Sequence, residues 1–153
     1  MLKKDEIFIT TTDTLIGIGS KINNDNLKAL YQLKQRPLDK KIVIVISSIE
    51  QLKKMENIDQ QTLEYIEKYW PGSTTLIINE NSYRMPNNKE LLKLISEEGP
   101  FFLTSANISG ENNCKTIEEA KKIFPSINKI YNFGYGTNVA SSIIDVATGR
   151  KLR

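Results

Sequence analysis

The sequence predicts a layered α/β or α+β domain built around a mixed β-sheet. Short runs of apolar and β-branched residues alternate with amphipathic segments, and no internal repeat or low-complexity linker interrupts them. The chain has 153 residues, of which 39% are hydrophobic and 25% are charged. This length and composition suit one hydrophobic core, so we expect a single domain over residues 1–153.

Short apolar segments are expected to form the strands. Ile42–Ile46 is almost wholly β-branched, which is typical of a central strand covered on both faces. Ile7–Ile9 runs directly into a polar segment of threonines, so the end of this strand is a candidate site. The other expected strands are Thr74–Ile78, Phe101–Thr104, Lys129–Phe133 and Ser142–Val146, with loops at 79–82 and 86–88.

Spacing and capping residues predict the helices. Apolar residues recur from Leu27 at helical spacing, and Lys34 continues their stripe onto the inward face of the helix. This helix should begin near residues 24–26 and end at Lys34 or Gln35, because Pro37 disfavours helical geometry before it. Further helices are expected after the Ser47–Ser48 cap, at 59–69, around Leu91–Ile95 and from Thr116 towards Phe124.

The composition excludes several kinds of chemistry. Histidine is absent and Cys114 is the only cysteine, so histidine-based catalysis, a disulfide and a cysteine-rich zinc site cannot be built. Any reaction must therefore rely on positioning and electrostatics. The net charge of +3 suits a phosphate-bearing ligand, although the lysines are spread along the chain.

The sequence also predicts a soluble, cytoplasmic protein that does not enter a membrane. Lys3–Glu6 places charges where a signal peptide needs an apolar stretch. No later apolar run approaches the roughly 20 residues that span a bilayer.

Two groups of polar residues are candidates for an ATP site. Ser105 and Asn107 follow an expected strand, where alternate residues point the same way and can share one ligand. Lys34 and Arg36 can grip a triphosphate, the arginine through its planar fork and the lysine as a point charge. The plainer interpretations are a polar turn in which Gly110 is left-handed, and a solvated helix end.

A third group suits a small ligand, whereas other notable residues have structural interpretations. Thr12 and Thr14 can bind an amino acid, or can simply cap a turn. Trp70 is expected to anchor the core before a turn. Gly17–Lys21 lacks the spacing of a P-loop and Gly134–Gly136 lacks the third glycine of a dinucleotide fingerprint, so any ATP site is unconventional.

Seven segments, in order along nearly the whole chain, resemble motifs of the Sua5/YrdC/YciO family. Lys34–Pro37 is similar to the family's Lys-x-Arg-Pro segment, and Thr104–Gly110 is close to its Ser-Ala-Asn-x-Ser-Gly signature. The other resembling segments are Thr12–Thr14 with Gly17, Tyr69–Gly72 with Thr75–Leu76, Arg84–Pro86, Ser141–Asp145 and Leu152–Arg153.

The resemblance implies a three-layer, YrdC/RibB-like domain whose twisted mixed sheet surrounds a concave, electropositive cavity. It implies an L-threonylcarbamoyladenylate synthase, which makes threonylcarbamoyl-AMP and pyrophosphate from L-threonine, bicarbonate and ATP for the t6A modification of tRNA. Mg2+ would arrive with the ATP, with no metal site in the protein. The implied partners are a threonylcarbamoyl transferase complex and tRNA.

The resemblance also implies roles for individual residues. The implied catalytic residues are Lys34, Arg36, Ser105 and Asn107. The implied ATP-binding residues are these four with Lys40, Thr75 and Arg153. The implied threonine-binding residues are Thr12, Thr14 and Ser141.

One departure from the family pattern touches this site, and two other functions stay open. Ile16 stands where the family has tyrosine, which is expected to alter the threonine pocket. The first alternative is a non-catalytic module that binds double-stranded RNA or tRNA through its concave basic surface. The second is a YciO-like, carbamoyl-handling relative that acts on another substrate.

Overall fold

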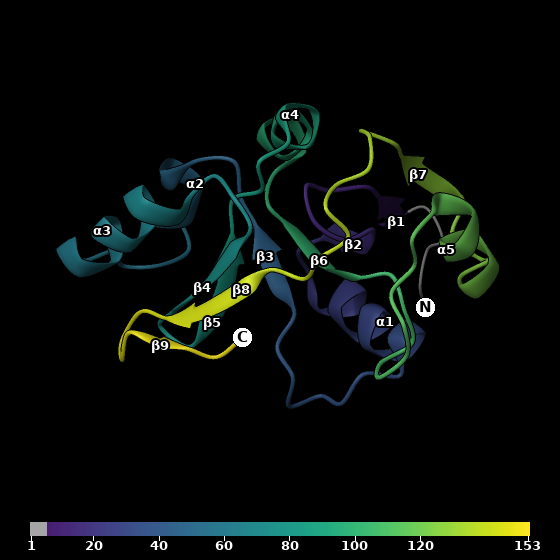
Figure 1. The fold of residues 1–153 in the computed structure, drawn as a ribbon, viewed down its shortest axis with the longest axis horizontal. Coiled ribbons are helices and arrows are strands. Elements are labelled where there is room, and N and C mark those ends of the chain that lie inside the picture. Colours follow the sequence, from purple (N-terminus) through teal and green to yellow (C-terminus); the bar gives the residue numbers. More distant parts are fainter. Residues whose placement is uncertain (1–5) are drawn as a thin grey trace.

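A nine-stranded mixed sheet forms the centre of the computed structural model, which describes residues 6–153 (Figure 1). The strand order is β7-β1-β2-β6-β3-β5-β4-β8-β9. β1–β7, β3–β5 and β4–β8 are parallel pairs, and the remaining neighbours are antiparallel. Residues 1–5, which hold most of the charged N-terminal stretch considered above, lie outside the described residues.

The expected alternation of strands and helices is confirmed. The strands are β1 (Ile7–Thr10), β2 (Gly17–Lys21), β3 (Val43–Val45), β4 (Thr74–Ile78), β5 (Asn81–Arg84), β6 (Phe101–Ser105), β7 (Lys129–Tyr131), β8 (Ser142–Asp145) and β9 (Arg150–Lys151). The helices are α1 (Asn24–Lys34), α2 (Ile49–Lys53), α3 (Gln60–Tyr69), α4 (Lys89–Glu98) and α5 (Ile117–Ile123). Side chains of Ser48, Asp59 and Thr116 cap α2, α3 and α5.

Strands β2, β5 and β9 were not expected from the sequence. The loop predicted at 79–82 is wrong, because Asn79 and Glu80 alone make the turn and the chain returns as β5 from Asn81. Both turn residues have positive φ angles, 50° and 72°, as the tightest hairpins require. In β2, a Cβ on Gly19 would lie 2.5 Å from the carbonyl oxygen of Phe102, so only glycine permits this close strand pairing.

Helices cover both faces of the sheet and form three layers with it (Figure 1). Ile9 and Ile18 pack with residues of α1 and α5 on one face, and α2 and α3 continue that layer over β4 and β5. Phe8 and Val45 pack with residues of α4 on the opposite face. Trp70 is buried beneath α3 and its indole N–H donates to the Thr74 carbonyl at 2.7 Å, which confirms it as a core anchor.

A ten-residue connection, which we call the strap (residues 132–141), joins β7 to β8 across the sheet (Figure 1). The Thr137 amide donates to the Asp13 carbonyl at 3.1 Å, and the Asn138 amide donates to the Thr14 carbonyl at 3.0 Å. The strap therefore lies against the loop between β1 and β2. Within residues 6–153, none of the helices combines the length and the hydropathy that a membrane-spanning helix needs.

We predict that Tyr83→Phe lowers the free energy of unfolding by about 1–2 kcal/mol at neutral pH, because the phenol donates to the Glu56 carboxylate at 2.5 Å. Burial alone would raise the pKa of Glu56, but hydrogen bonds from Tyr83, Asn81 and Asn79 hold it below its ordinary 4.5. A carboxyl group whose pKa is depressed by folding stabilises the fold while it is ionised. This stabilisation is lost in acid, as the pH falls through the folded-state pKa. Urea unfolding at several pH values should show the deficit shrinking below about pH 4, and a constant deficit would contradict this account.

Candidate functional site

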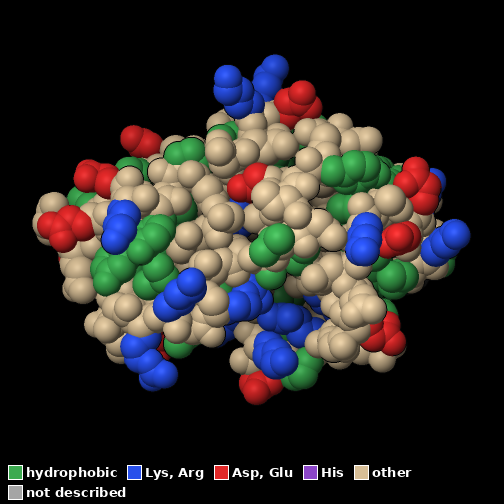
Figure 2. Space-filling model, viewed as in Figure 1, with side chains coloured by type: hydrophobic (Ala, Val, Ile, Leu, Met, Phe, Trp, Pro, Cys, Tyr) green, Lys and Arg blue, Asp and Glu red, His purple; other side chains and the backbone are tan. Residues whose placement is uncertain are grey.

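A cavity of about 250 Å³ opens on the concave side of the sheet. Its walls come from the β1–β2 loop, strands β3 to β6, the strap and the C-terminal residues. Lys and Arg side chains gather around a hollow in the lower middle of the view in Figure 2. Seven of the ten residues that the sequence predicted for the site line this cavity, namely Thr12, Thr14, Arg36, Thr75, Ser105, Ser141 and Arg153.

The loop between β1 and β2 presents two buried threonines to the cavity. The Thr14 amide donates to the Thr12 hydroxyl oxygen at 2.9 Å, and that hydroxyl donates to the Leu15 carbonyl at 2.6 Å. The capped turn and the cavity wall are therefore the same structure. Ile16, expected to alter the threonine pocket, is 5% exposed and packs in the core, whereas its neighbour Leu15 lines the cavity.

A buried ion pair supports this loop, and the sequence reasoning missed its role. Arg84, at the end of β5, lines the cavity and is 5% exposed. Its Nη1 lies 2.7 Å from Asp13 Oδ1, and its Nη2 donates to the Thr14 hydroxyl at 3.0 Å. The second Asp13 oxygen accepts from the Asn87 amide at 2.8 Å. In the sequence Arg84 stands out only as part of the Arg84–Pro86 segment, and its acidic partner Asp13 is distant along the chain.

Ser141 joins the opposite wall rather than the threonine loop. Its hydroxyl lies 2.9 Å from that of Thr75, and its carbonyl accepts from Arg153 Nε at 2.8 Å. Arg153 and Arg36 both line the cavity, and burial and then the positive charge of Arg36 lower the pKa of Arg153. Thr75, Ser141 and Arg153 thus form one cluster.

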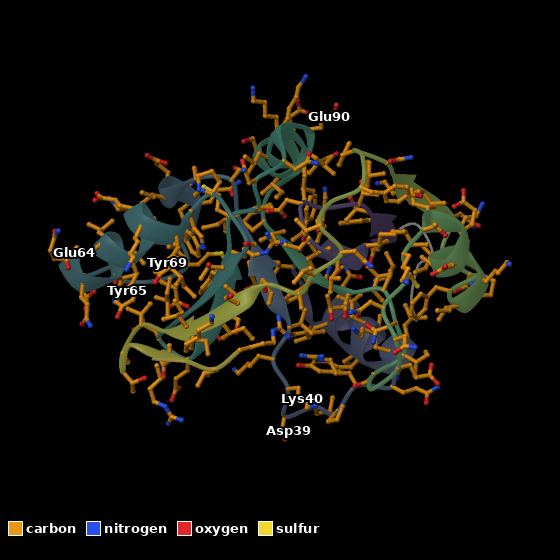
Figure 3. All side chains as sticks on the ribbon, in the orientation of Figure 1. Asp39, Lys40, Glu64, Tyr65, Tyr69 and Glu90 are labelled. Atoms are coloured by element: carbon orange, nitrogen blue, oxygen red, sulfur yellow. The ribbon has the colours of Figure 1, made fainter. Side chains whose placement is uncertain are left out.

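Arg36 is held in place by the loop that follows α1. Its Nη2 donates to the Lys41 carbonyl at 2.7 Å and its Nε to the Lys40 carbonyl at 3.2 Å. Lys41 lines the cavity. Lys40, predicted as an ATP ligand, is exposed beside Asp39 on the loop at the bottom of the view in Figure 3.

Lys34 and Asn107 lie behind the cavity wall. Lys34 is 1% exposed, and its Nζ donates to oxygens of Thr104, Ser105 and Asn107. Asn107 is 7% exposed, and its amide nitrogen donates to the carbonyls of Ile108 and Glu111. The polar turn around Ser105 and Asn107 therefore forms, and Gly110 within it has a φ of 85°.

The charges of the cavity are strongly unbalanced. Across residues 6–153 the ion pairs are Lys21–Glu98 and Asp13–Arg84. Arg36, Lys41 and Arg153 consequently face the cavity without an acidic partner among those residues. Such a cluster attracts a multiply charged anion. Cys114 adds no nucleophile, since its buried thiol donates to the Ala106 carbonyl and burial, then Glu119, raises its pKa.

Comparisons with known proteins point in one direction. The protein-family model of the Sua5, YciO and YrdC proteins, which carries the description "Telomere recombination", matches residues 1–153. Threonylcarbamoyl-AMP synthase of Yersinia enterocolitica is 29% identical over 174 residues, covering 99% of this chain and 90% of the relative. An uncharacterized protein of Mycoplasma genitalium is 40% identical over 111 residues, covering 72% of this chain but only 23% of that protein.

Solved structures share the fold. P. abyssi Sua5 complexed with L-threonine has a TM-score of 0.83 and 26% identity, over 92% of this chain and 47% of that protein. E. coli YciO has a TM-score of 0.80 and 19% identity, over 93% of this chain and 78% of that protein. The chain therefore spans less than half of that Sua5 chain. The expected twisted mixed sheet is confirmed by both.

We predict that Asp13→Ala lowers the free energy of unfolding by about 3 kcal/mol, because it leaves the Arg84 guanidinium buried without its partner. Urea denaturation measures the loss. Asp39→Ala is the matched control, since Asp39 is exposed on a loop and its removal should change stability by less than about 0.5 kcal/mol. Equal stability of the two variants would show that the ion pair contributes nothing.

A second prediction concerns the pKa of Lys34. Burial, and to a smaller extent the positive charge of Arg36, lower this pKa from 10.5 to about 7. The unfolded chain keeps this proton up to about pH 10.5, so the wild type should gain stability relative to Lys34→Met as pH rises from about 7 to 10.5. We expect a gain of at least about 1 kcal/mol, limited by the acceptors that favour the ammonium. Paired unfolding curves that stay parallel over this range would refute the shift.

Proposed function

Because the chain belongs to the Sua5/YrdC/YciO family, we propose that it is a threonylcarbamoyl-AMP synthase. Threonine's amine condenses with bicarbonate to give a carbamate and one molecule of water, and a carbamate oxygen then attacks the α-phosphorus of ATP. The bond to the β-phosphate oxygen breaks and pyrophosphate leaves. The proposal rests on one observation above the others: unpaired cations and buried hydroxyl groups line the same cavity.

The cationic part of the cavity suits the triphosphate of ATP. Arg36 is held by two carbonyls of its own loop, so its guanidinium is ordered before a ligand arrives. Arg36, Lys41 and Arg153 supply positive charge against the phosphates and against the charge that builds on the departing pyrophosphate. Thr75 lies beside Arg153 through Ser141 and offers a hydroxyl at the same wall. Lys40 is exposed on the loop that follows α1 and is not among the residues that line the cavity.

The threonine-rich part of the cavity suits a small amino acid. Thr12 and Thr14 are 2% and 6% exposed and carry the hydroxyl groups on this wall. Arg84 holds the Thr14 hydroxyl by a hydrogen bond, and the carboxylate of Asp13 neutralises the charge of Arg84. Ser141 closes the cavity from the strap and can meet the amino acid where it approaches the phosphates.

The reaction needs no covalent enzyme intermediate, which agrees with the sequence. The enzyme would accelerate the reaction in two ways. It would hold the carbamate in line with the α-phosphorus, and it would neutralise the charge of the phosphates. Among residues 6–153 no three acidic or thiol side chains gather as metal ligands, and Asp13 is engaged by Arg84 and the Asn87 amide. In this proposal magnesium would be carried by the phosphates of ATP. A cytoplasmic threonylcarbamoyl transferase complex would take the product to tRNA.

We predict that the purified protein releases pyrophosphate from ATP only when threonine and bicarbonate are both present. Arg36→Ala should lower kcat/KM for ATP at least about tenfold, since a charged contact with phosphate is worth more than about 1.4 kcal/mol. The readout is coupled pyrophosphate detection, with serine and other amino acids in parallel. Release supported equally by another amino acid would favour the YciO-like alternative.

Lys68→Ala provides the charge-matched control, because Lys68 is exposed on α3 away from the cavity. Its kinetics should equal those of the wild type. If neither protein releases pyrophosphate but both bind tRNA in a salt-sensitive manner, the enzyme proposal fails and the RNA-binding module replaces it.

A further inference from the structure

In its protonated form, Lys34 has no N–H group left for a ligand. Its Nζ lies 2.6 Å from the Ser105 carbonyl, 2.9 Å from the Thr104 hydroxyl, 3.1 Å from the Ser105 hydroxyl and 3.2 Å from Asn107 Oδ1. An ammonium group has three donors, so four acceptors already exceed its capacity. The backbone of Lys34 holds the same loop, because its carbonyl accepts from the Ser109 amide at 2.8 Å.

The orientation of the Asn107 amide is determined by its other contacts. Its nitrogen donates to the carbonyls of Ile108 at 3.0 Å and Glu111 at 2.8 Å, and these partners can only accept. Oδ1 must therefore face Lys34 and Ser105. This oxygen carries no proton, so the bond of 2.6 Å to Ser105 is donated by the serine hydroxyl.

These contacts leave Ser105 with one free hydrogen-bonding position. A serine hydroxyl has one donor and two acceptor lone pairs. The donor goes to Asn107 and one lone pair accepts from Lys34, while Ser105 itself lines the cavity. The remaining lone pair can meet only a donor on the ligand. A phosphate oxygen, which only accepts, cannot bond to it in this arrangement.

We propose that Lys34 is a positioning residue that, with Asn107, presents the Ser105 hydroxyl to the cavity as an acceptor for a substrate N–H or O–H group. This inference rests on the proposed function and refines it, because Lys34 then leaves the set of direct phosphate ligands expected from the sequence. Candidate donors are the ribose hydroxyls of ATP and the amine or hydroxyl of threonine.

The test separates phosphate binding from turnover, with inorganic triphosphate as the calorimetric probe. Lys34→Met and Ser105→Ala should each bind triphosphate within about twofold of the wild type, whereas Arg36→Ala should bind it at least about tenfold more weakly. Both variants should lower kcat about tenfold or more, and the double variant should fall no further than the worse single variant. The proposal is overturned if either variant binds triphosphate tenfold more weakly than the wild type. It is also overturned if the loss of kcat in the double variant equals the product of the losses in the two single variants.

Two controls keep the outcome decidable. Thermal melts verify folding, and Lys34→Gln, which keeps two donors, replaces Lys34→Met if the latter does not fold. Triphosphate binding is measured without turnover and so does not depend on the proposed reaction. If the wild type binds triphosphate but releases no pyrophosphate, the proposed function fails. The comparison of triphosphate binding by the wild type and Lys34→Met still tests whether Lys34 binds phosphate.

Substrate analogues identify the donor. If a ribose hydroxyl donates to Ser105, Ser105→Ala raises KM for ATP and no longer discriminates against 2′-deoxy-ATP or 3′-deoxy-ATP. If threonine donates, the same variant raises KM for threonine alone. Either result supports the assignment of Ser105 as an acceptor, and unchanged KM values for both substrates together with an unchanged kcat contradict it.

Discussion

The short length of the strap limits how flat the sheet can be, and the arrangement of the cavity follows from this limit. It joins β7 to β8, which are separated by seven strand spacings in the sheet order. At about 4.8 Å per spacing, these strands would be roughly 34 Å apart in a flat sheet. Ten residues at about 3.3–3.6 Å each barely reach so far when fully extended. The strap is not fully extended, since Gly134 and Asn138 have positive φ angles and its amides bind the β1–β2 loop. The sheet must therefore curl.

Curling and twist bring opposite ends of the sheet together at the cavity. The pairing registers place Arg84 four strands from Thr10 and near the other end of the strands. In a flat sheet these residues would be roughly 20 Å or more apart. Twist of about 20–25° per strand accumulates to roughly a right angle over this distance. Arg84 consequently reaches Asp13 and holds the loop that carries Thr12 and Thr14.

The cations around the cavity divide into two kinds. Lys34 and Arg84 are almost fully buried, and polar partners of this chain bind each of them. Arg36, Lys41 and Arg153 lie at the cavity and are not paired with acids among residues 6–153. A buried charge destabilises the fold unless polar partners compensate for its lost hydration. A cation at the cavity that lacks an acidic partner is instead available to bind an anion. Lys34 and Arg84 thus help to build the site, and the three other cations face the cavity.

Local sequence patterns predict the alternation of elements, the helix caps and the groups of polar residues at strand ends, because these features depend on periodicity and short-range hydrogen bonding. They misjudged β2 and β5, where close approach at Gly19 and the turn at Asn79–Glu80 depend on neighbouring strands. The folded chain alone reveals that Lys34 lies behind Ser105, that Arg153 binds Ser141, and that Asp13 pairs with Arg84. These contacts join residues that are far apart in the chain, and the curvature of the whole sheet sets the distances between them.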